Sequence, residues 1–484
     1  MCICATSPRQ ERARAGERVI RFLTSVVAGA CALAPGIAAA AETAVDGREL
    51  GLAWILPFAG LLLSIALLSL VAPHFWHRHY GKVAAAWAAA FLVPFALRFG
   101  WSAASHELVH VIVVDYVPFI VLLAALYIAA GGVLLKGSLS GTPLSNTAFL
   151  AGGALLASIV GTTGACMLLI KPLLRANAWR ERTAHTWVFF IFLVGNIGGA
   201  LTPLGDPPLY IGFLQGVDFF WPTVHLAAPT ALVAGLLLAL YLALDTIAVG
   251  QETATTRPKA DWHGIEGARN IAVLASIPLV VVATGAWESG ITATLGGIDF
   301  TLEEVVRTAA IALLGALAWA WTDPMVRRHN EFSWEPIAEV AKLFAAIFVC
   351  IVPALAIIGA GEEGAAAPLV RMLNVDGQPQ NGTYFWAAGL LSSVLDNAPT
   401  YLVFFNLAGG DAVALQTTLA RTLEAVSAGA VFMGALTYVG NAPNFMVRGI
   451  VTAHGRRMPS FFGYIAWSVA VLGPAFALVH WAFF

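Results

Sequence analysis

The feature that most constrains this chain is the recurrence of long apolar segments from about residue 53 to the C-terminus. Most of them are close to the ~20 residues that an α-helix needs to cross the hydrocarbon core of a bilayer. Only 11% of the 484 residues are charged, too few to cover the surface of a soluble protein of this size. The sequence therefore predicts an all-α integral membrane protein. Its partner is the lipid bilayer; no nucleic acid is expected, because the net charge is −2 and there is no basic domain.

The first 41 residues differ from the rest. Arg12, Arg14, Arg18 and Arg21 precede an apolar run from Phe22 to Ala34, and small residues around Ala41 follow a Pro-Gly break. This order is typical of a cleaved signal peptide over residues 1–41. An uncleaved first helix is the alternative. A signal peptide implies a bacterial-type inner (plasma) membrane, and the recurring apolar segments make the expected protein multi-pass.

We expect ten complete spans, near residues 53–72, 82–99, 110–135, 186–217, 220–244, 269–287, 303–321, 337–360, 421–447 and 460–483. Two further apolar segments, 145–174 and 384–407, are interrupted near the middle by polar or small residues. Lys and Arg concentrate in cytoplasmic loops. Their pattern here fits only if each of the two segments enters and leaves the membrane on one side, as a re-entrant hairpin. One cytoplasmic loop, 73–82, holds three histidines that we expect to be solvated.

Each half of the chain then has five spans and one hairpin, and an odd number of spans between equivalent elements orients the halves oppositely. We therefore expect two inverted repeats joined by a cytoplasmic linker. The first repeat is 50–247 (hairpin 145–174, broken helix 186–217), the linker is 248–268, and the second repeat is 269–484 (hairpin 384–407, broken helix 421–447). Gly199 to Pro208 also aligns with Gly434 to Pro443 at an offset of 434 − 199 = 235, with six of ten positions identical.

The aligned segments place Gly, Pro, Thr and Asn or Asp inside stretches that are otherwise apolar enough to span. Proline removes a backbone donor and obstructs a continuing helix. A broken helix at membrane depth is tolerated only where the freed backbone groups meet protein, water or a bound solute. Discontinuous helices that open onto a binding site are therefore predicted, and a simple kink is the alternative.

Asp206 and Asp396 are the main candidates for that site. An ionised carboxylate at bilayer depth costs ~2.5–3.5 kcal/mol on insertion scales, so it usually marks an ion pathway or a proton relay. Burial favours the protonated form of a carboxyl group, so that a proton and a sodium ion can compete for it. The alternative is that either aspartate caps a helix end. Asp115 is expected near the outer end of its span, in solvent. Neutral side chains that supply further oxygen ligands are Thr162, Thr163, Asn196, Thr202, Asn397, Thr400, Thr437, Asn441 and Asn444.

One motif favours a different class of protein. His106, Glu107 and His110 fit H-E-x-x-H, in which two histidines on one helix face hold zinc beside a general-base glutamate. Asp376 is the candidate third ligand, and the protein would then be a membrane zinc metalloprotease. We expect a transporter and not an enzyme, because the repeat and the paired helix breaks have no role in a protease.

The interrupted segments resemble the ion transporter superfamily, which includes sodium:proton antiporters, citrate and dicarboxylate carriers, and arsenite exporters. The resemblance covers about residues 50–484 and is carried by residues 160–165 (VGTTGA), 196–208 (NIGGALTPLGDPP), 392–400 (SSVLDNAPT) and 440–444 (GNAPN). It implies a scaffold that forms a homodimer and a mobile transport domain that holds the hairpin tips and the broken helices. Transport would be elevator-like.

The hairpin tips differ from those of the dicarboxylate carriers, which resemble Ser-Asn-Thr; here they are Gly161-Thr162-Thr163 and Asp396-Asn397-Ala398. Two acids at the site would repel an anion. We therefore expect a sodium (or lithium)/proton antiporter of a small ion substrate, with Asp206 and Asp396 as the sodium sites and no cofactor besides the coupling ions Na⁺ and H⁺. A sodium- or proton-coupled citrate or dicarboxylate carrier is the alternative, since bound sodium would neutralise the acids.

Overall fold

The computed structural model describes residues 46–252, 261–295, 298–375 and 377–484. The predicted signal peptide, residues 1–41, lies outside the described residues, as does part of the predicted linker.

Ten helices in the described part of the chain are long and apolar enough to cross a membrane. They are Leu52–Val71, Pro73–Phe99, Trp101–Gly131, Pro143–Val160, Ala184–Leu201, Ala227–Gly250, Ala268–Gly285, Leu302–Trp321, Glu335–Gly359 and Phe461–Phe483. Nine of them overlap predicted spans. Pro143–Val160 instead belongs to the first predicted hairpin, and the predicted span 421–447 is divided into shorter pieces. The chain is an all-α multi-pass membrane protein, as its composition predicted.

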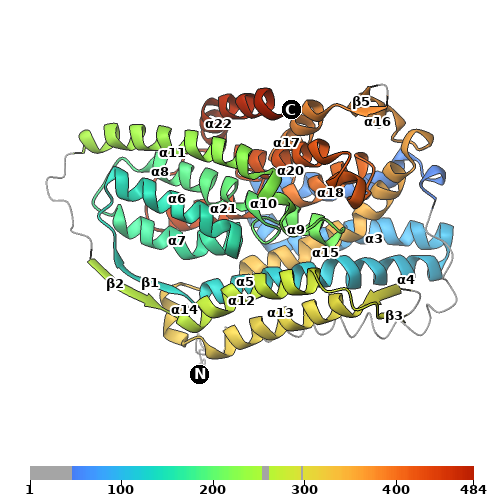
Figure 1. Ribbon diagram of the computed structural model, residues 1–484, viewed down its shortest axis with the longest axis horizontal. Helices are drawn as coiled ribbons and strands as arrows, with labels where there is room; N and C mark the ends of the chain where they lie inside the picture. The colour runs from blue at the N-terminus through green and yellow to red at the C-terminus, as the bar shows by residue number, and fades with distance from the viewer. Residues whose placement is uncertain (1–45, 253–260, 296–297, 376) are drawn as a thin grey trace, which may run out of the picture.

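One group of helices comes from the beginning of each half of the chain. It comprises α2 (Leu56–Val71), α3 (Pro73–Phe99), α4 (Trp101–His110), the π-helical turn η4 (Val111–Tyr116), α5 (Val117–Gly131), α12 (Ala268–Gly285), α13 (Leu302–Trp321), α14 (Pro324–His329) and α15 (Glu335–Gly359). Helix α3 packs on α2 and α15, and α13 packs on α5 and α12. Figure 1 shows α5, α12 and α13 running side by side.

A second group holds the interrupted segments. Its first-half members are α6 (Pro143–Val160), α7 (Thr162–Ala176), α8 (Ala184–Leu193), η5 (Ile197–Leu201), α9 (Pro207–Leu214), α10 (Trp221–His225) and α11 (Ala227–Gly250). Its second-half members are α17 (Asn381–Val394), α18 (Asn397–Leu407), α19 (Ala412–Gln416), α20 (Ala420–Met433), η7 (Gly434–Leu436), α21 (Ala442–Ala453) and α22 (Phe461–Phe483). The halves interlock, because α9 packs on α18 and α21 packs on α7.

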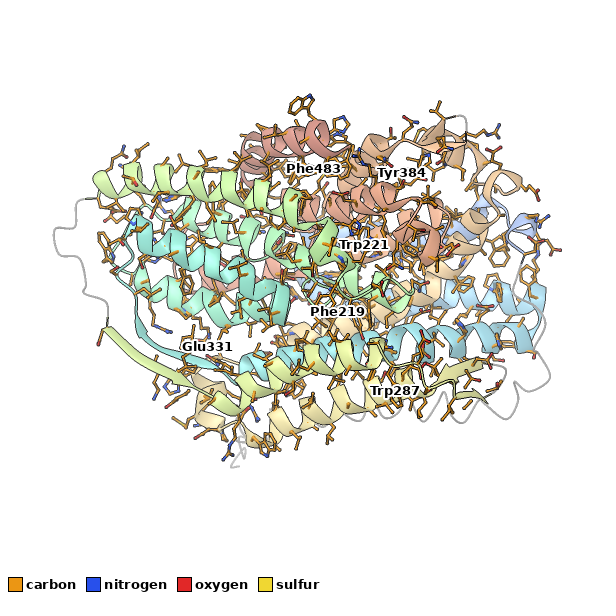
Figure 2. All side chains as sticks on the ribbon, viewed as in Figure 1. Phe219, Trp221, Trp287, Glu331, Tyr384 and Phe483 are labelled. Carbon is orange, nitrogen blue, oxygen red and sulfur yellow. The ribbon has the colours of Figure 1, made fainter. Side chains whose placement is uncertain are left out.

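Aromatic side chains lie both between these helices and on the outside of the molecule. Tyr384 is fully buried, whereas Trp287 is exposed (Figure 2). Exposed apolar residues such as Leu97 and Trp481 fit helices whose outer faces meet lipid.

Short strands and turns connect the helices. Strand β1 (Leu134–Ser138) pairs antiparallel with β2 (Asp261–Glu266), β3 (Thr292–Leu295) with β4 (Ile298–Thr301), and β5 (Asn374–Val375) with β6 (Gln378–Pro379). The remaining elements are η2 (Gly47–Glu49), η3 (Leu52–Ile55), η6 (Gly361–Glu363) and α16 (Ala367–Leu373). The predicted span 110–135 extends too far, because the helix stops at Gly131 and β1 begins at Leu134. The end of the predicted linker is β2, which pairs with that strand.

Two further predictions were wrong in detail. Residues 73–82 are the first turns of α3 and not a loop, because Pro73 occupies the first helical position, where its fixed φ favours a helix start. Asp115 lies in the middle of the continuous helical run from Trp101 to Gly131, within the π-helical turn, and not near its end.

Candidate functional site

The first broken helix opens at Asp206. Turn η5 ends at Leu201 and α9 begins at Pro207, followed by Pro208. Proline is tolerated in the first turn of a helix, but it lacks the N–H group that would extend a preceding helix. The helix therefore ends before Asp206 and a new one begins at Pro207. The Asp206 backbone is extended (φ −141°, ψ 143°), and its carboxylate makes no capping bond to α9. The carboxylate is therefore free to accept hydrogen bonds from elsewhere.

The second broken helix has the same local structure. Asn441 precedes α21 with an extended backbone (φ −152°, ψ 139°) and no side-chain cap. Thr437 Oγ1 donates to the Ser393 carbonyl oxygen at 2.5 Å, as Thr202 Oγ1 donates to the Ser158 carbonyl oxygen at 2.5 Å. Both residues of each bond correspond at the offset of 235 found in the sequence (437 − 202 and 393 − 158). The two breaks thus share backbone conformation and hydrogen bonding.

The tip between α6 and α7 lies against the first break. Gly161 has a φ of 81°, in the region that favours glycine, and it lets α7 begin at Thr162. The Thr162 amide donates to the Gly205 carbonyl oxygen at 2.8 Å. This backbone bond holds the tip beside Asp206.

The tip between α17 and α18 is closed by Asp396. Its carboxylate accepts from the Ala398 amide at 3.3 Å, and Thr400 Oγ1 donates to the Asp396 carbonyl oxygen at 3.0 Å. The helix-cap alternative therefore describes the geometry of Asp396 but not that of Asp206. Asp396 is only half-buried.

Asp206 is the point at which all four interrupted segments meet. It accepts hydrogen bonds from Thr162 Oγ1 at 3.1 Å, from Asn441 Nδ2 at 3.0 Å and from Asn397 Nδ2 at 2.5 Å. The Asp206 side chain is buried, with 1% of the residue exposed. The Asn397 Oδ1 atom is also buried but has no hydrogen-bond partner among the described residues. The site therefore combines one carboxylate with a buried amide oxygen that is free to bind a ligand.

A second layer of amides supports this cluster. Asn441 Nδ2 also donates to Asn196 Oδ1 at 3.2 Å, and Asn196 Nδ2 donates to Asn444 Oδ1 at 2.9 Å. Asn444 Nδ2 in turn donates to the carbonyl oxygens of Gly434 and Thr437. Amides of both halves thus hold Asn441 in place.

The other predicted ligands lie farther out. Thr202, Thr437 and Thr400 donate their hydroxyl groups to backbone carbonyls, as described above, and Thr163 lines a neighbouring cavity. Asp396 is not among the hydrogen-bond partners of Asp206, and it lines the cavity beside the site. Of the predicted neutral ligands, Thr162, Asn397 and Asn441 are the ones that donate hydrogen bonds to Asp206.

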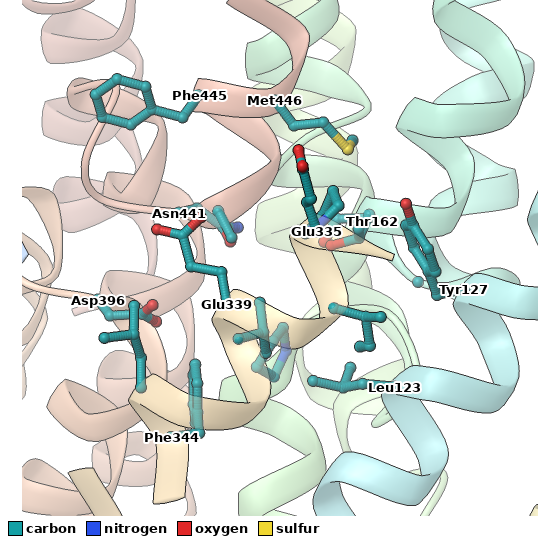
Figure 3. Close-up of a pocket in the computed structure, with 18 of the residues that line it drawn as sticks. Leu123, Tyr127, Thr162, Glu335, Glu339, Phe344, Asp396, Asn441, Phe445 and Met446 are labelled. Atoms are coloured by element: carbon teal, nitrogen blue, oxygen red, sulfur yellow. The ribbon is translucent and has the colours of Figure 1, made fainter. Parts of the chain in front are cut away.

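A cavity of about 930 Å³ adjoins the site (Figure 3). On the site's side it is lined by residues 161–164, Asp396 and Asn441. The opposite wall consists of α2, α3, α5 and α15, and its polar residues are Ser69, Trp76, His77, Tyr80, Tyr127, Glu335 and Glu339. Glu335 and Glu339 were not among the residues predicted from the sequence. The signal for them was two glutamates one turn apart at the start of an apolar helix.

The H-E-x-x-H motif lies on α4, away from this cavity, with the His106 and His110 ring centroids 6.4 Å apart. Asp376, its candidate third ligand, lies outside the described residues. Within the described residues, no group of three His, Cys, Asp or Glu side chains is placed to hold a metal ion.

Comparison with protein families shows that residues 47–484 match the family CitMHS_2, whose description is "Putative citrate transport". No curated protein matches the chain. The match covers the whole described structure, including both broken helices and both tips that surround Asp206. The chain therefore belongs to the CitMHS_2 family of citrate-transporter-like membrane proteins and is a secondary transporter.

Proposed function

We propose that the protein is a sodium (or lithium)/proton antiporter in which cation and proton compete for Asp206. The observation that carries this proposal is the convergence of Thr162, Asn397 and Asn441 on that buried carboxylate. One negative charge balances one monovalent cation, and neutral oxygens suit a hard cation. Asn397 Oδ1, which is buried and has no hydrogen-bond partner in the described part of the chain, supplies such an oxygen. When a proton replaces the cation, the carboxyl group is neutral and remains hydrogen-bonded.

The charge of the cavity supports cations over anions. Glu335, Glu339 and Asp396 line it, against a single arginine, Arg448. A cavity with excess negative charge attracts cations and repels anions before they reach the site.

We further propose that the halves are inverted repeats, that α6–α7 and α17–α18 are re-entrant hairpins, and that the second group of helices moves as an elevator against the first. The matched bonds of Thr202 and Thr437 support the repeat. The packing of α7 on α21 and of α9 on α18 supports movement of the second group as one body. A homodimer in a bacterial inner membrane follows from the family resemblance.

A second candidate function is a sodium- or proton-coupled citrate carrier. The family description favours it. So does Arg448, whose guanidinium lies 4.8 Å from the Tyr438 ring centroid, beside the cavity. Arginine is the side chain best suited to bind a carboxylate. In such a carrier Asp206 would bind the coupling cation.

Everted membrane vesicles test these functions. Addition of sodium or lithium should collapse a preset pH gradient, and Asp206→Asn or Asp396→Asn should abolish the response. Asp218→Asn changes an exposed loop residue outside the cavity and should leave the response intact. Unchanged exchange in Asp206→Asn would overturn the role of Asp206. No response to either cation, together with uptake of labelled citrate, would establish the carrier instead.

A further inference from the structure

We propose that Glu339 is a specificity-determining residue that concentrates small cations on the path to Asp396 and Asp206. Glu339 lies on the cavity wall that faces the binding site, outside the four sequence segments that carry the family resemblance. The inference rests on the proposed transport of cations, and it assigns a role to the other wall of the same cavity.

The position of Glu339 is well defined. It is half-buried on α15, lines the cavity together with Asp396 and Asn441, and extends from the helix into that space (Figure 3). Trp76 of α3, a residue that is only 3% exposed, lines the same cavity. Glu339 therefore borders the cavity between α15 and α3, opposite Asp396 and Asn441.

The charges around Glu339 leave the cavity wall negative. His77 of α3 and Lys342 of α15 are the nearby groups that can carry positive charge, and Glu335 is a second carboxylate on α15. The Lys342 ammonium is directed to Tyr80, 3.4 Å from its hydroxyl and 5.1 Å from its ring centroid. From the opposite wall, Asp396 and Arg448 face the same space. Among the described residues, no ion pair within 4 Å neutralises Glu339.

A carboxylate in a cavity with apolar walls raises the local concentration of cations, because the low dielectric of the walls focuses its field. Dissolved salt screens this effect. Glu339 lines the cavity and is not among the hydrogen-bond partners of Asp206. Its removal should therefore change how readily a cation arrives rather than how fast the loaded protein turns over. The half-saturating sodium concentration should change and the maximal rate should not.

Full-length protein in liposomes tests this at low ionic strength. Glu339→Gln should raise the half-saturating sodium concentration about threefold to tenfold, with a nearly unchanged maximal rate. Added choline chloride should reduce the difference from wild type. Glu362→Gln, a change at an exposed glutamate beyond the other end of α15, is the matched control and should behave as wild type. An unchanged half-saturating concentration, or a fall in maximal rate alone, would overturn the inference.

The same variant separates this inference from the proposed function. If wild type takes up citrate and does not exchange sodium, the antiport proposal fails. In that case a negatively charged cavity wall repels citrate, so Glu339→Gln should lower the half-saturating citrate concentration. An unchanged half-saturating citrate concentration would overturn the role of Glu339 as well. If folded wild-type protein has neither activity, both proposals are wrong.

Discussion

Asn441 donates a 3.0 Å hydrogen bond to Asp206 from a position 235 residues farther along the chain. This separation equals the offset at which the two broken helices align, so the two side chains occupy equivalent positions in them. One is charged and the other is neutral. The paired breaks therefore share their backbone structure but contribute only one negative charge to their centre, which matches a single monovalent cation.

Asn397→Ala should weaken cation binding. The change removes a hydrogen bond to the Asp206 carboxylate and the unpaired Oδ1 atom. A hydrogen bond to a charged group contributes about 1.5–3 kcal/mol, so the half-saturating sodium concentration should rise about tenfold or more. Asn406→Ala, on the same helix, removes only a bond to the Leu402 carbonyl and is the control. Equal behaviour of the two variants in the vesicle assay would contradict a role for Asn397 in binding.

Gly205→Ala should abolish transport. This variant tests whether the first broken helix needs the close backbone approach between Gly205 and Gly199. A Cβ atom at Gly205 would lie 2.1 Å from the Gly199 carbonyl oxygen, and one at Gly440 would lie 2.6 Å from the Gly434 carbonyl oxygen. These are backbone atoms, so neither clash can be relieved by a side-chain rotation. Gly235→Ala in α11 meets no atom within 4 Å and should be neutral or stabilising by about 0.5–1 kcal/mol. Thermal unfolding and vesicle transport measure both effects; a functional Gly205→Ala protein would show that the break tolerates widening.

Arg180→Met should destabilise the protein strongly. Arg180 and Asp245 form a fully buried ion pair with a 2.5 Å contact, and His185 Nε2 lies 2.7 Å from the same Asp245 oxygen. Loss of one partner leaves a buried charge and costs about 3–5 kcal/mol, whereas an apolar pair removes both charges. The double variant Arg180→Met/Asp245→Leu should therefore recover much of the loss. Arg182→Gln, at an exposed arginine, is the control for thermal unfolding in detergent. A single variant no less stable than the double one would contradict this account.

Glu331 links the two groups of helices in a pH-dependent way. The Lys171 ammonium of α7 lies 3.0 Å from the Glu331 carboxylate, and this contact with Lys171 lowers the pKa of Glu331. A lowered pKa gives stability that is present above the ordinary pKa of glutamate and lost as the pH falls through the lower value. Because Glu331 is largely exposed, the pair contributes no more than about 1 kcal/mol. Wild type and Glu331→Gln should differ slightly in melting temperature at pH 7 and converge below about pH 4.

Glu331 is also the one described non-glycine residue with a positive φ, 49°. Glycine adopts this conformation without a steric penalty. Glu331→Gly should therefore melt no lower than Glu331→Gln, although both lack the ion pair. A lower melting temperature for the glycine variant would show that the backbone at this position is not strained.

Much of the fold was predictable because membrane spans are local features. A segment of about 20 apolar residues must cross or be buried as a helix whatever surrounds it. The breaks were predictable for the same reason: Pro207 and Pro208 exclude a continuous helix through their own covalent structure. Asp206 was predictable as a site residue because an ionised carboxylate is costly within an apolar segment of the membrane and usually has a functional role there. The inverted orientation of the halves and the re-entrant hairpins stay predictions.

The contacts of the site were decided by the tertiary structure. Sequence alone proposed nine neutral ligands, and packing brought Thr162, Asn397 and Asn441 to Asp206 while it turned Asp396 into a helix cap. It also placed Glu339 of α15 across the cavity from them. Composition and residue spacing determine whether each segment can span the membrane and where its helix must break. For this chain they determined a membrane-spanning protein with two broken helices. Which side chains meet depends on how helices far apart in the chain pack, and local sequence does not specify that.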